Sequence, residues 1–342
     1  MAAAVIEFYK GFDTYAIYGA EAVFGTPVAP AATSRIGRVT SVNFTMTNNF
    51  FRTQGMGEGR NVTGTFTGPF DASGTIEWDV DDFTFMQYAI GPRAGSGTLA
   101  DPYELQERDN IGYDATNIPT LSIEIGSQGD TLDDTTTFDG CVLNTLTISA
   151  TQGEVLKASA EIIARSVATG TALETYTAPT SRVFVFHEGN VTVGTDTLHC
   201  SSFELTVSNN IQTHRRLGSR FIQLPTTGLR RYDFTITLRK KYDDTAGVLS
   251  GTEIRNQFFG ASGAPATAAV VTAQAISLDI NEGTGASGDR VVNIDLSNCY
   301  FESWSEPIQL EGGAIEVTVT GYGHSGLADG ANNVPIRYYT VA

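Results

Sequence analysis

The feature of this sequence that most constrains its fold is an internal repeat, in which short segments recur after about 155 to 161 positions. SVNFTMTNNF at positions 41–50 aligns with SFELTVSNNI at 202–211, with serine, threonine and both asparagines in common. In both segments apolar residues alternate with polar ones in the same phase, which is typical of a strand with one buried face. The repeat therefore predicts the same strand twice.

Four further pairs of segments follow in the same order along the chain. They are TIEW (75–78) with TITL (235–238), LSIEIG (121–126) with ISLDIN (276–281), GCVL (140–143) with NCYF (298–301), and GEVLKASAE (153–161) with GGAIEVTVT (312–320). Each match is weak alone, because strands of β-sandwiches resemble one another. Their common order favours a tandem duplication of one β-rich domain.

Each copy has the same predicted organisation. A strand ends at an Asn-Asn turn, and a long loop rich in glycine and arginine leads to a second strand, one short helix and three more strands. The second strands lie at 74–80 and 232–240, and the helices at 81–91 and 251–260. We therefore predict a mainly β protein: two tandem copies of a β-sandwich or barrel domain, each with one short flanking helix.

The predicted boundaries follow from the repeat. Residues 1–166 form the first domain with an N-terminal arm, 167–197 a linker and a hairpin, and 198–342 the second domain. The hairpin is expected around Glu188, Gly189 and Asn190. The uncharged segment 260–275 is expected to be a flexible surface loop.

Composition and charge exclude several classes of protein. Of the 342 residues, 41% are hydrophobic and 17% charged, which argues against a disordered or coiled-coil protein. The net charge of −17 argues against wrapping duplex DNA. Three cysteines are too few for a disulfide scaffold and indicate reduced thiols. Neither a secretory signal nor an apolar stretch of membrane length is visible, so we expect a soluble protein made in the cytoplasm.

Motifs for catalysis or ligand binding fail in their sequence context. The four histidines have no metal-ligand spacing, and two G-x-G-x-x-G matches, at 283–288 and 321–326, lack the helix that would receive a phosphate. The acidic run 129–134 lacks the spacing of a calcium loop. Cys141 and Cys299 occupy equivalent positions and are interpreted as core thiols. We expect no enzyme activity, no cofactor, and no catalytic or metal-binding residues.

Beyond these patterns, the duplicated Asn-Asn turns, the glycine and arginine loops TNNFFRTQGMGEGRNVTG and SNNIQTHRRLGSR, and the GEVLKASAE-type strand resemble the tail tube proteins of long-tailed phages. The resemblance spans most of residues 36–322. It implies a β-sandwich or barrel with one flanking helix, polymerised into stacked rings around an acidic channel for DNA, in the tail of the virion.

Rings in that family commonly contain six single-domain subunits, whereas this chain carries two copies. We therefore expect a homotrimeric ring with pseudo-sixfold symmetry, in which copy one meets copy two at every junction. The resemblance implies as partners further copies of this chain, the tape measure protein and DNA transiently in the lumen, and sheath, terminator and baseplate proteins. It implies no membrane partner.

Charge differs between equivalent parts of the two copies. Residues 51–82 carry a net charge of −4, whereas 212–242 carry +7, and Asp79 and Asp81 align with Arg239 and Lys241. Opposite charges at equivalent sites favour copy one beside copy two. The expected subunit-interface residues are Asp79, Asp81, Asp82, Arg239, Lys240 and Lys241. The alternatives are unrelated solvated faces or a basic stretch that binds an acidic partner.

The two long loops are expected to reach the next ring, because loops that project from a rigid sheet commonly make contacts. The expected inter-ring residues are Asn48, Asn49, Arg52, Gly57, Arg60, Asn209, Asn210, Arg215, Arg216 and Arg220. Alternative functions are a tail terminator or baseplate ring protein of similar fold, or a carbohydrate-binding or adhesin β-sandwich module. An enzyme is a further alternative with little support.

Overall fold

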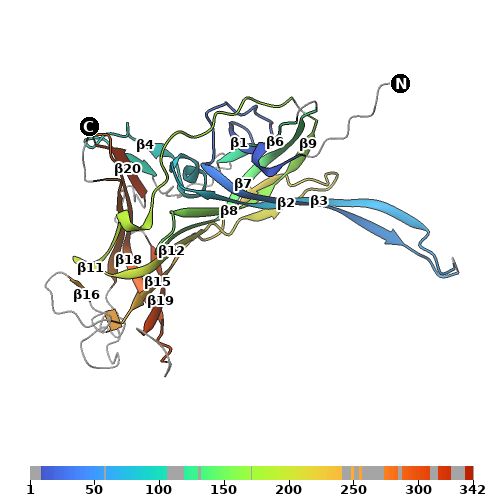
Figure 1. Cartoon of the computed structure of the whole chain (residues 1–342). Helices are drawn as coiled ribbons and strands as arrows, with labels where there is room; N and C mark the ends of the chain where they lie inside the picture. The colour runs from blue at the N-terminus through green and yellow to red at the C-terminus, as the bar shows by residue number, and fades with distance from the viewer. Residues whose placement is uncertain are drawn as a thin grey trace.

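The protein is described by a computed structural model that covers residues 9–57, 59–105, 119–129, 132–170, 172–240, 248–249, 254–255, 273–283, 287–308, 315–324 and 336–341. Within these residues, the strands join into one sheet of 18 strands and a separate two-stranded hairpin (Figure 1). The predicted mainly β fold is confirmed.

The first half contains β1 to β9 and the second half β10 to β20. The first-half elements are η1 (Gly11–Asp13), β1 (Thr14–Glu21), β2 (Arg38–Thr53), β3 (Gly64–Asp79), η2 (Thr84–Met86), α1 (Gln87–Ile90), β4 (Arg93–Ala94), β5 (Tyr103–Leu105), β6 (Thr120–Ser127), β7 (Asp134–Thr151), β8 (Lys157–Ala164) and β9 (Ser166–Thr169). The second-half elements are η4 (Phe186–Glu188), β10 (Gly189–Val193), β11 (Asp196–Leu198), β12 (Cys200–Ser208), β13 (Gln212–His214), β14 (Leu224–Thr226), β15 (Arg231–Arg239), β16 (Val248–Leu249), β17 (Gln274–Asn281), β18 (Arg290–Ser305), β19 (Glu316–His324) and β20 (Ile336–Thr340).

Strands of the two halves pair in the same antiparallel order. In the first half the pairs are β1–β6, β2–β3, β3–β8, β6–β7, β7–β8 and β7–β9. The second half repeats them as β10–β17, β12–β15, β15–β19, β17–β18, β18–β19 and β18–β20. Three register shifts also recur: 39/41 with 200/202, 121/123 with 274/276, and 143/145 with 301/303.

Each half has two layers, because β7 and β18 are long and take part in both. One layer is a continuous sheet in the order β2–β3–β8–β7–β12–β15–β19–β18. In Figure 1, β1, β6 and β9 lie above the first half of this sheet. The core between the layers holds large apolar side chains such as Trp78, Phe138, Phe203 and Phe234, which alternation along the strands directs to one face.

Two of the predicted turns differ from the structure. In the first half β2 continues through Asn48 and Asn49 with only a register shift, because Phe50 and Phe51 pair with β3. In the second half β12 does end before the asparagines, and Asn210 adopts a positive φ of 48°. The hairpin expected around Glu188 instead turns at Gly194, between β10 and β11, since residues 186–188 form a 3-10 turn.

The structure also corrects the predicted length of the first helix and the alignment of one pair of repeated segments. The first helix is shorter than 81–91: Asp82 caps the amide of Thr84, and a 3-10 turn leads into α1. The aligned segments 121–126 and 276–281 are offset by two residues, because Ile123 and Ile276 occupy the equivalent register positions. A slip of two leaves every side chain on the same face, so alternation alone could not detect it. The second helix, apart from 254–255, and the loop 260–275, apart from its last three residues, lie outside the described residues.

The two halves are joined by a seam, defined here as the pairing of β7 with β12 from Thr145↔Ser208 to Thr151↔Ser202. Buried Asn209 extends this seam, because its amide nitrogen donates to the carbonyls of Ala89 and Leu143 at 3.0 and 3.1 Å. Arg230 donates to the Asn209 side chain at 2.8 Å and to the Ile90 carbonyl at 2.7 Å. The end of α1 is thereby fixed to the second half.

A second polar cluster lies inside the first half. Glu21 accepts hydrogen bonds at 2.8 Å from Ser122 and from the amide of Gly140. The neighbouring Asp139 is only 4% exposed. Burial, and then the charge of Glu21, raise the pKa of Asp139 from 3.8 to about 6, against the opposing effects of Ser122 and Arg165.

Replacement of Asn209 tests the seam. We expect Asn209→Ala to lower the free energy of unfolding by about 1–3 kcal/mol, because buried carbonyls lose their donor. Denaturant unfolding monitored by tryptophan fluorescence measures this. Asn48→Ala is the matched control, since Asn48 occupies the equivalent place but is exposed, and its side chain accepts a hydrogen bond from Arg220. Equal effects of the two changes would contradict the assignment.

Replacement of Asp139 tests the acid cluster. A carboxyl whose pKa is raised on folding binds its proton more tightly in the folded state, so its contribution to stability is lost as pH rises from about 4 to about 6. We expect Asp139→Asn to flatten the pH dependence of unfolding in that window and to raise the melting temperature at pH 7. Asp101→Asn, at an exposed position, serves as control. An unchanged pH profile for Asp139→Asn would refute the cluster's role.

Candidate functional site

The first surface feature is the face of the eight-stranded sheet that points away from the core, here called the polar face. It consists mostly of serine and threonine, since each strand alternates these with buried apolar residues. One row runs from β3 to β18 through registered pairs: Asp79, Lys157, Ser149, Glu204, Thr235, Thr320 and Ser303. The polar face is therefore continuous across the seam.

Carboxylates outnumber cationic side chains on the polar face. Its acidic residues are Asp71, Glu77, Asp79, Glu161, Glu204, Asp233 and Glu316, and its basic residues are Arg38, Lys157, Arg231 and Arg239. Hydroxyl groups pair across the seam, as Thr147 and Thr206 do at 3.2 Å. Short uncharged side chains with an excess of carboxylates give a surface that attracts phosphate weakly.

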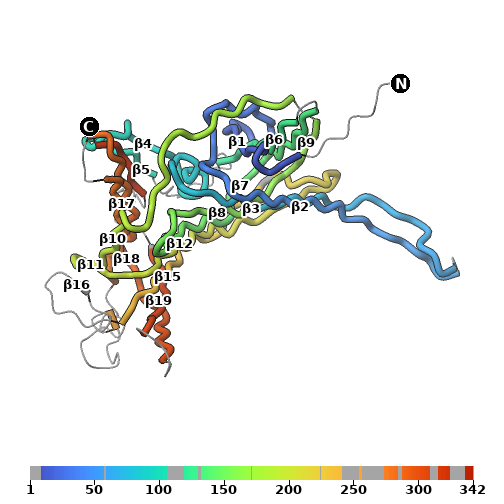
Figure 2. The backbone as a smooth tube through the Cα atoms, viewed as in Figure 1, coloured from blue at the N-terminus to red at the C-terminus, as the bar shows by residue number. Residues whose placement is uncertain are grey.

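The second surface feature is an arm, residues 46–72, formed by the outer parts of β2 and β3. Figures 1 and 2 show it extending far beyond the body of the molecule. Along it Met46, Phe50, Phe51 and Phe66 are at least half exposed, and Met56 at the tip is fully exposed. Exposed apolar side chains in a row are typical of a contact surface.

The predicted inter-ring residues occupy different surroundings in the two halves. Asn49, Arg52, Gly57 and Arg60 lie on the arm, and Asn49 donates to Asp71 at 2.7 Å. Asn209 is buried at the seam, and Asn210 and Arg216 are exposed near the short β13–β14 hairpin.

The loop between β13 and β14 instead contacts the base of the arm within the same chain. Arg215 pairs with Asp71, and Arg220 donates to Asn48 at 2.6 Å. The Phe70 amide donates to the Arg220 carbonyl at 3.0 Å, and the rings of Phe70 and Phe221 pack edge to face at 5.8 Å. Sequence spacing carries no signal for this packing, because the partners are 144 to 172 residues apart.

Several predicted subunit-interface residues have partners within the chain. Asp81 is fully buried and accepts a hydrogen bond from Ser181 at 2.7 Å, with Arg35 at 4.0 Å. Asp82 caps Thr84. Lys240 forms an ion pair with Glu306 and holds the pKa of that carboxyl below its ordinary value. Lys241 lies outside the described residues.

The charge reversal between the halves has a local counterpart. Asp79 lies opposite Lys157 in the β3–β8 register, and the equivalent Arg239 lies opposite Glu316 in the β15–β19 register. Each half therefore contains an oppositely charged cross-strand pair with the signs exchanged. This exchange accounts for the sign difference at 79 and 239 without a second chain.

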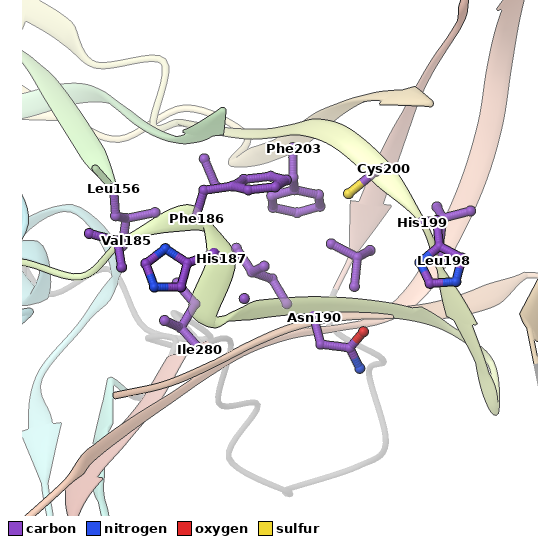
Figure 3. Close-up of a pocket in the computed structure, with 14 residues that line it drawn as sticks. Leu156, Val185, Phe186, His187, Asn190, Leu198, His199, Cys200, Phe203 and Ile280 are labelled. Atoms are coloured by element: carbon purple, nitrogen blue, oxygen red, sulfur yellow. The ribbon is translucent and has the colours of Figure 1, made fainter. Parts of the chain in front are cut away.

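A cavity of about 200 Å³ lies beside η4, between the seam and β10. Figure 3 shows its apolar lining, including Phe186 and Phe203, with His187 and His199 at separate places and Cys200 beside the ring of Phe203. Burial raises the pKa of Cys200 to about 11, so its thiol stays protonated at neutral pH. Among the described residues no group of three or more His, Cys, Asp or Glu is arranged to hold a metal.

Comparisons with known proteins identify the family. In the part of the chain that is described, no helix has the length and apolar character required to cross a membrane. A search of curated proteins finds no match. The sequence matches the family described as phage tail tube protein over residues 11–327, nearly the whole chain. The chain therefore belongs to the phage tail tube protein family, whose members are structural proteins of the virion tail.

Proposed function

We propose that three copies of this chain close into a ring in which first and second halves alternate, and that stacked rings form the tail tube through which DNA is ejected. The observation that carries this proposal is the polar face, which continues across the seam from β2 to β18. A sheet with one apolar and one hydroxyl-rich face suits the wall of a water-filled channel, because its core lies on the outer side.

In this ring the two halves would be tandem copies of one tube domain, residues 1–166 and 198–342, joined by 167–197. The six repeated strand pairings and three repeated register shifts support this, because register shifts are position-specific features. Six equivalent domains per ring then follow from three chains. The symmetry is threefold for the chain and approximately sixfold for the wall.

The channel would conduct DNA by not binding it. Carboxylates outnumber cations on the polar face, so phosphates are repelled within a Debye length of about 8–10 Å. Serine and threonine leave few long cationic side chains that could pair with phosphates. Transient neighbours in the lumen would be DNA and the tape measure protein.

Stacking of rings is assigned to the arm. The second-half counterpart is the short β13–β14 hairpin, which is already packed on the base of the arm. The arm, by contrast, has exposed apolar side chains along its length. Each ring would therefore present three arms to the next ring, while terminator, sheath and baseplate proteins would contact the ends or outside of the tube.

Assembly of the purified protein tests this function. We expect negative-stain micrographs to show long hollow tubes with threefold modulation, because each ring contributes three arms. Isolated rings that never stack would favour the alternative of a terminator or baseplate ring protein. Monomers at all concentrations would refute a tube.

Added positive charge tests the lumen. We expect Thr147→Arg with Thr235→Arg to leave tube assembly intact but to lower infectious titre by about tenfold, because two cations per chain would hold phosphates. Slow DNA release from purified virions should recover with added salt. The control is Gln128→Arg with Thr195→Arg, at exposed positions off the polar face in the two halves. An equal loss of titre in the control would remove the polar face from the mechanism.

A further inference from the structure

We infer that neighbouring chains join by antiparallel pairing of the end of β18 in one chain with β2 of the next, in the register of the internal seam. This inference rests on the proposed ring and specifies which residues close it. In this register Ser305 lies opposite Thr45 of the next chain, Trp304 opposite Met46, and Ile308 opposite Val42.

The free strand edges are the first observation. In the described part of the chain, β2 pairs only with β3, so its other edge is unpaired along its length. Among the described residues, Ser303 to Ser305 of β18 pair only with β19. The equivalent part of β7 has β8 on one side and β12 on the other. Each chain thus has one unpaired edge on β2 and one at the end of β18. Unpaired edges favour the addition of a strand from another chain.

The register follows from the repeated shifts. The shift at 143/145 recurs at 301/303, so β7 corresponds to β18 with an offset of 158. The shift at 39/41 recurs at 200/202, so β2 corresponds to β12 with an offset of 161. Transferring the seam pair Thr147↔Thr206 by these offsets gives Ser305 and Thr45. The two offsets therefore determine a single register between β18 of one chain and β2 of the next.

Side chains agree with the transferred register. The hydroxyls of Thr147 and Thr206, 3.2 Å apart, become those of Ser305 and Thr45, again two hydroxyls. The buried pair Leu146 and Val207 becomes Trp304, partly exposed, and Met46, half exposed in the single chain. Both would be covered in the ring, and sulfur packs favourably against an aromatic ring.

Ile308 supplies an independent observation, since it is 73% exposed in the single chain. Its counterpart Ala150 is buried against Phe203 at the cavity beside η4. In the transferred register Ile308 would enter the matching space beside Val42 of the next chain. A larger apolar side chain than Ala150 suits this position because Val42 is smaller than Phe203.

Ionic contacts beside the seam are not reproduced between chains. Arg215 and Asp71 correspond to Gln54 and Arg231, which form no ion pair. The arm therefore lacks the ion pair that helps to dock the β13–β14 loop, which favours its use as a contact with the next ring. Strand pairing and apolar burial carry the contact between chains, whereas ion pairs assist the seam within the chain.

Disulfide trapping tests the register. Ser305→Cys with Thr45→Cys should cross-link chains in assembled protein, giving dimer and closed-trimer bands on a non-reducing gel. Thr147→Cys with Thr206→Cys is the matched positive control within the chain. Ser305→Cys with Asn43→Cys is shifted by two residues and should cross-link at least about tenfold less, because diagonal neighbours lie about 7–8 Å apart. Each single variant controls for the native cysteines.

The outcomes separate this inference from the proposed function. Normal tubes with no cross-link at 305/45, or with equal cross-linking at 305/43, would overturn the register while leaving the tail tube standing. A wild-type protein that forms neither rings nor tubes would overturn both.

Ile308→Asp gives a second test. Ring formation, measured by light scattering and microscopy, should be lost, whereas the melting temperature of the monomer should not change, since Ile308 is exposed there. Val23→Asp is the control, because Val23 is 65% exposed and lies outside the proposed contact. Rings of Ile308→Asp that form as the wild type does would refute the role of this side chain.

Discussion

The pairing of β7 with β12 is the interaction on which the rest of the structure depends. Without it the chain would be two separate β domains connected by a linker. With it, eight strands form one sheet, and the hydroxyl rows of one half continue into those of the other. The seam also determines what is left unpaired: it covers one edge of β7 and of β12, so β18 and β2 remain as the outer edges. Asn209 and Arg230 add buried polar contacts that fix the angle between the halves.

A single alternation of residue types produces both the core and the polar face. In β15, for example, Phe234 and Ile236 are buried, while Thr235 and Thr237 lie on the opposite face. Threonine favours strands and carries a short hydroxyl, so it stabilises the sheet without placing a long charged group on the surface. The fold and the surface chemistry therefore depend on the same residues. The charged residues of the polar face, seven acidic and four basic, are therefore set among short hydroxyl groups.

Much of the fold was predictable from the repeat, because strands of one period and one order recur at nearly constant offsets. The alignment of segment 121–126 with 276–281 is wrong by two residues. Alternation cannot reveal such an error, because a shift of two residues keeps every side chain on the same face of the strand. The arm was predicted as a loop, because the Asn-Asn pair indicated a turn. The phenylalanines at 50, 51 and 66, which favour strands, were the signal against a turn. Partners such as Arg215 with Asp71 were not predictable, since long-range side-chain contacts leave no local pattern. Aligned charges at 79 and 239 suggested a contact between chains, whereas strand register gives each a partner in its own half.

The two halves agree in their strands and differ in their hairpins, and the difference has a consequence for assembly. If all six domains of a ring had identical edges and arms, any domain could follow any other, and two first halves could meet. Here β7 and β12 are already paired within the chain, so the edges of the eight-stranded sheet that remain for another chain are those of β18 and β2 in the described residues. A head-to-tail contact between the β18 edge of one chain and the β2 edge of the next produces either a closed ring or an open filament. The bend at each junction determines which of the two forms. If the junction between chains repeats the register of the seam, as we propose, the bend at the seam also sets the bend between chains. In that proposed ring three equal chains would close the wall, and the unequal hairpins would make the stacking of rings threefold.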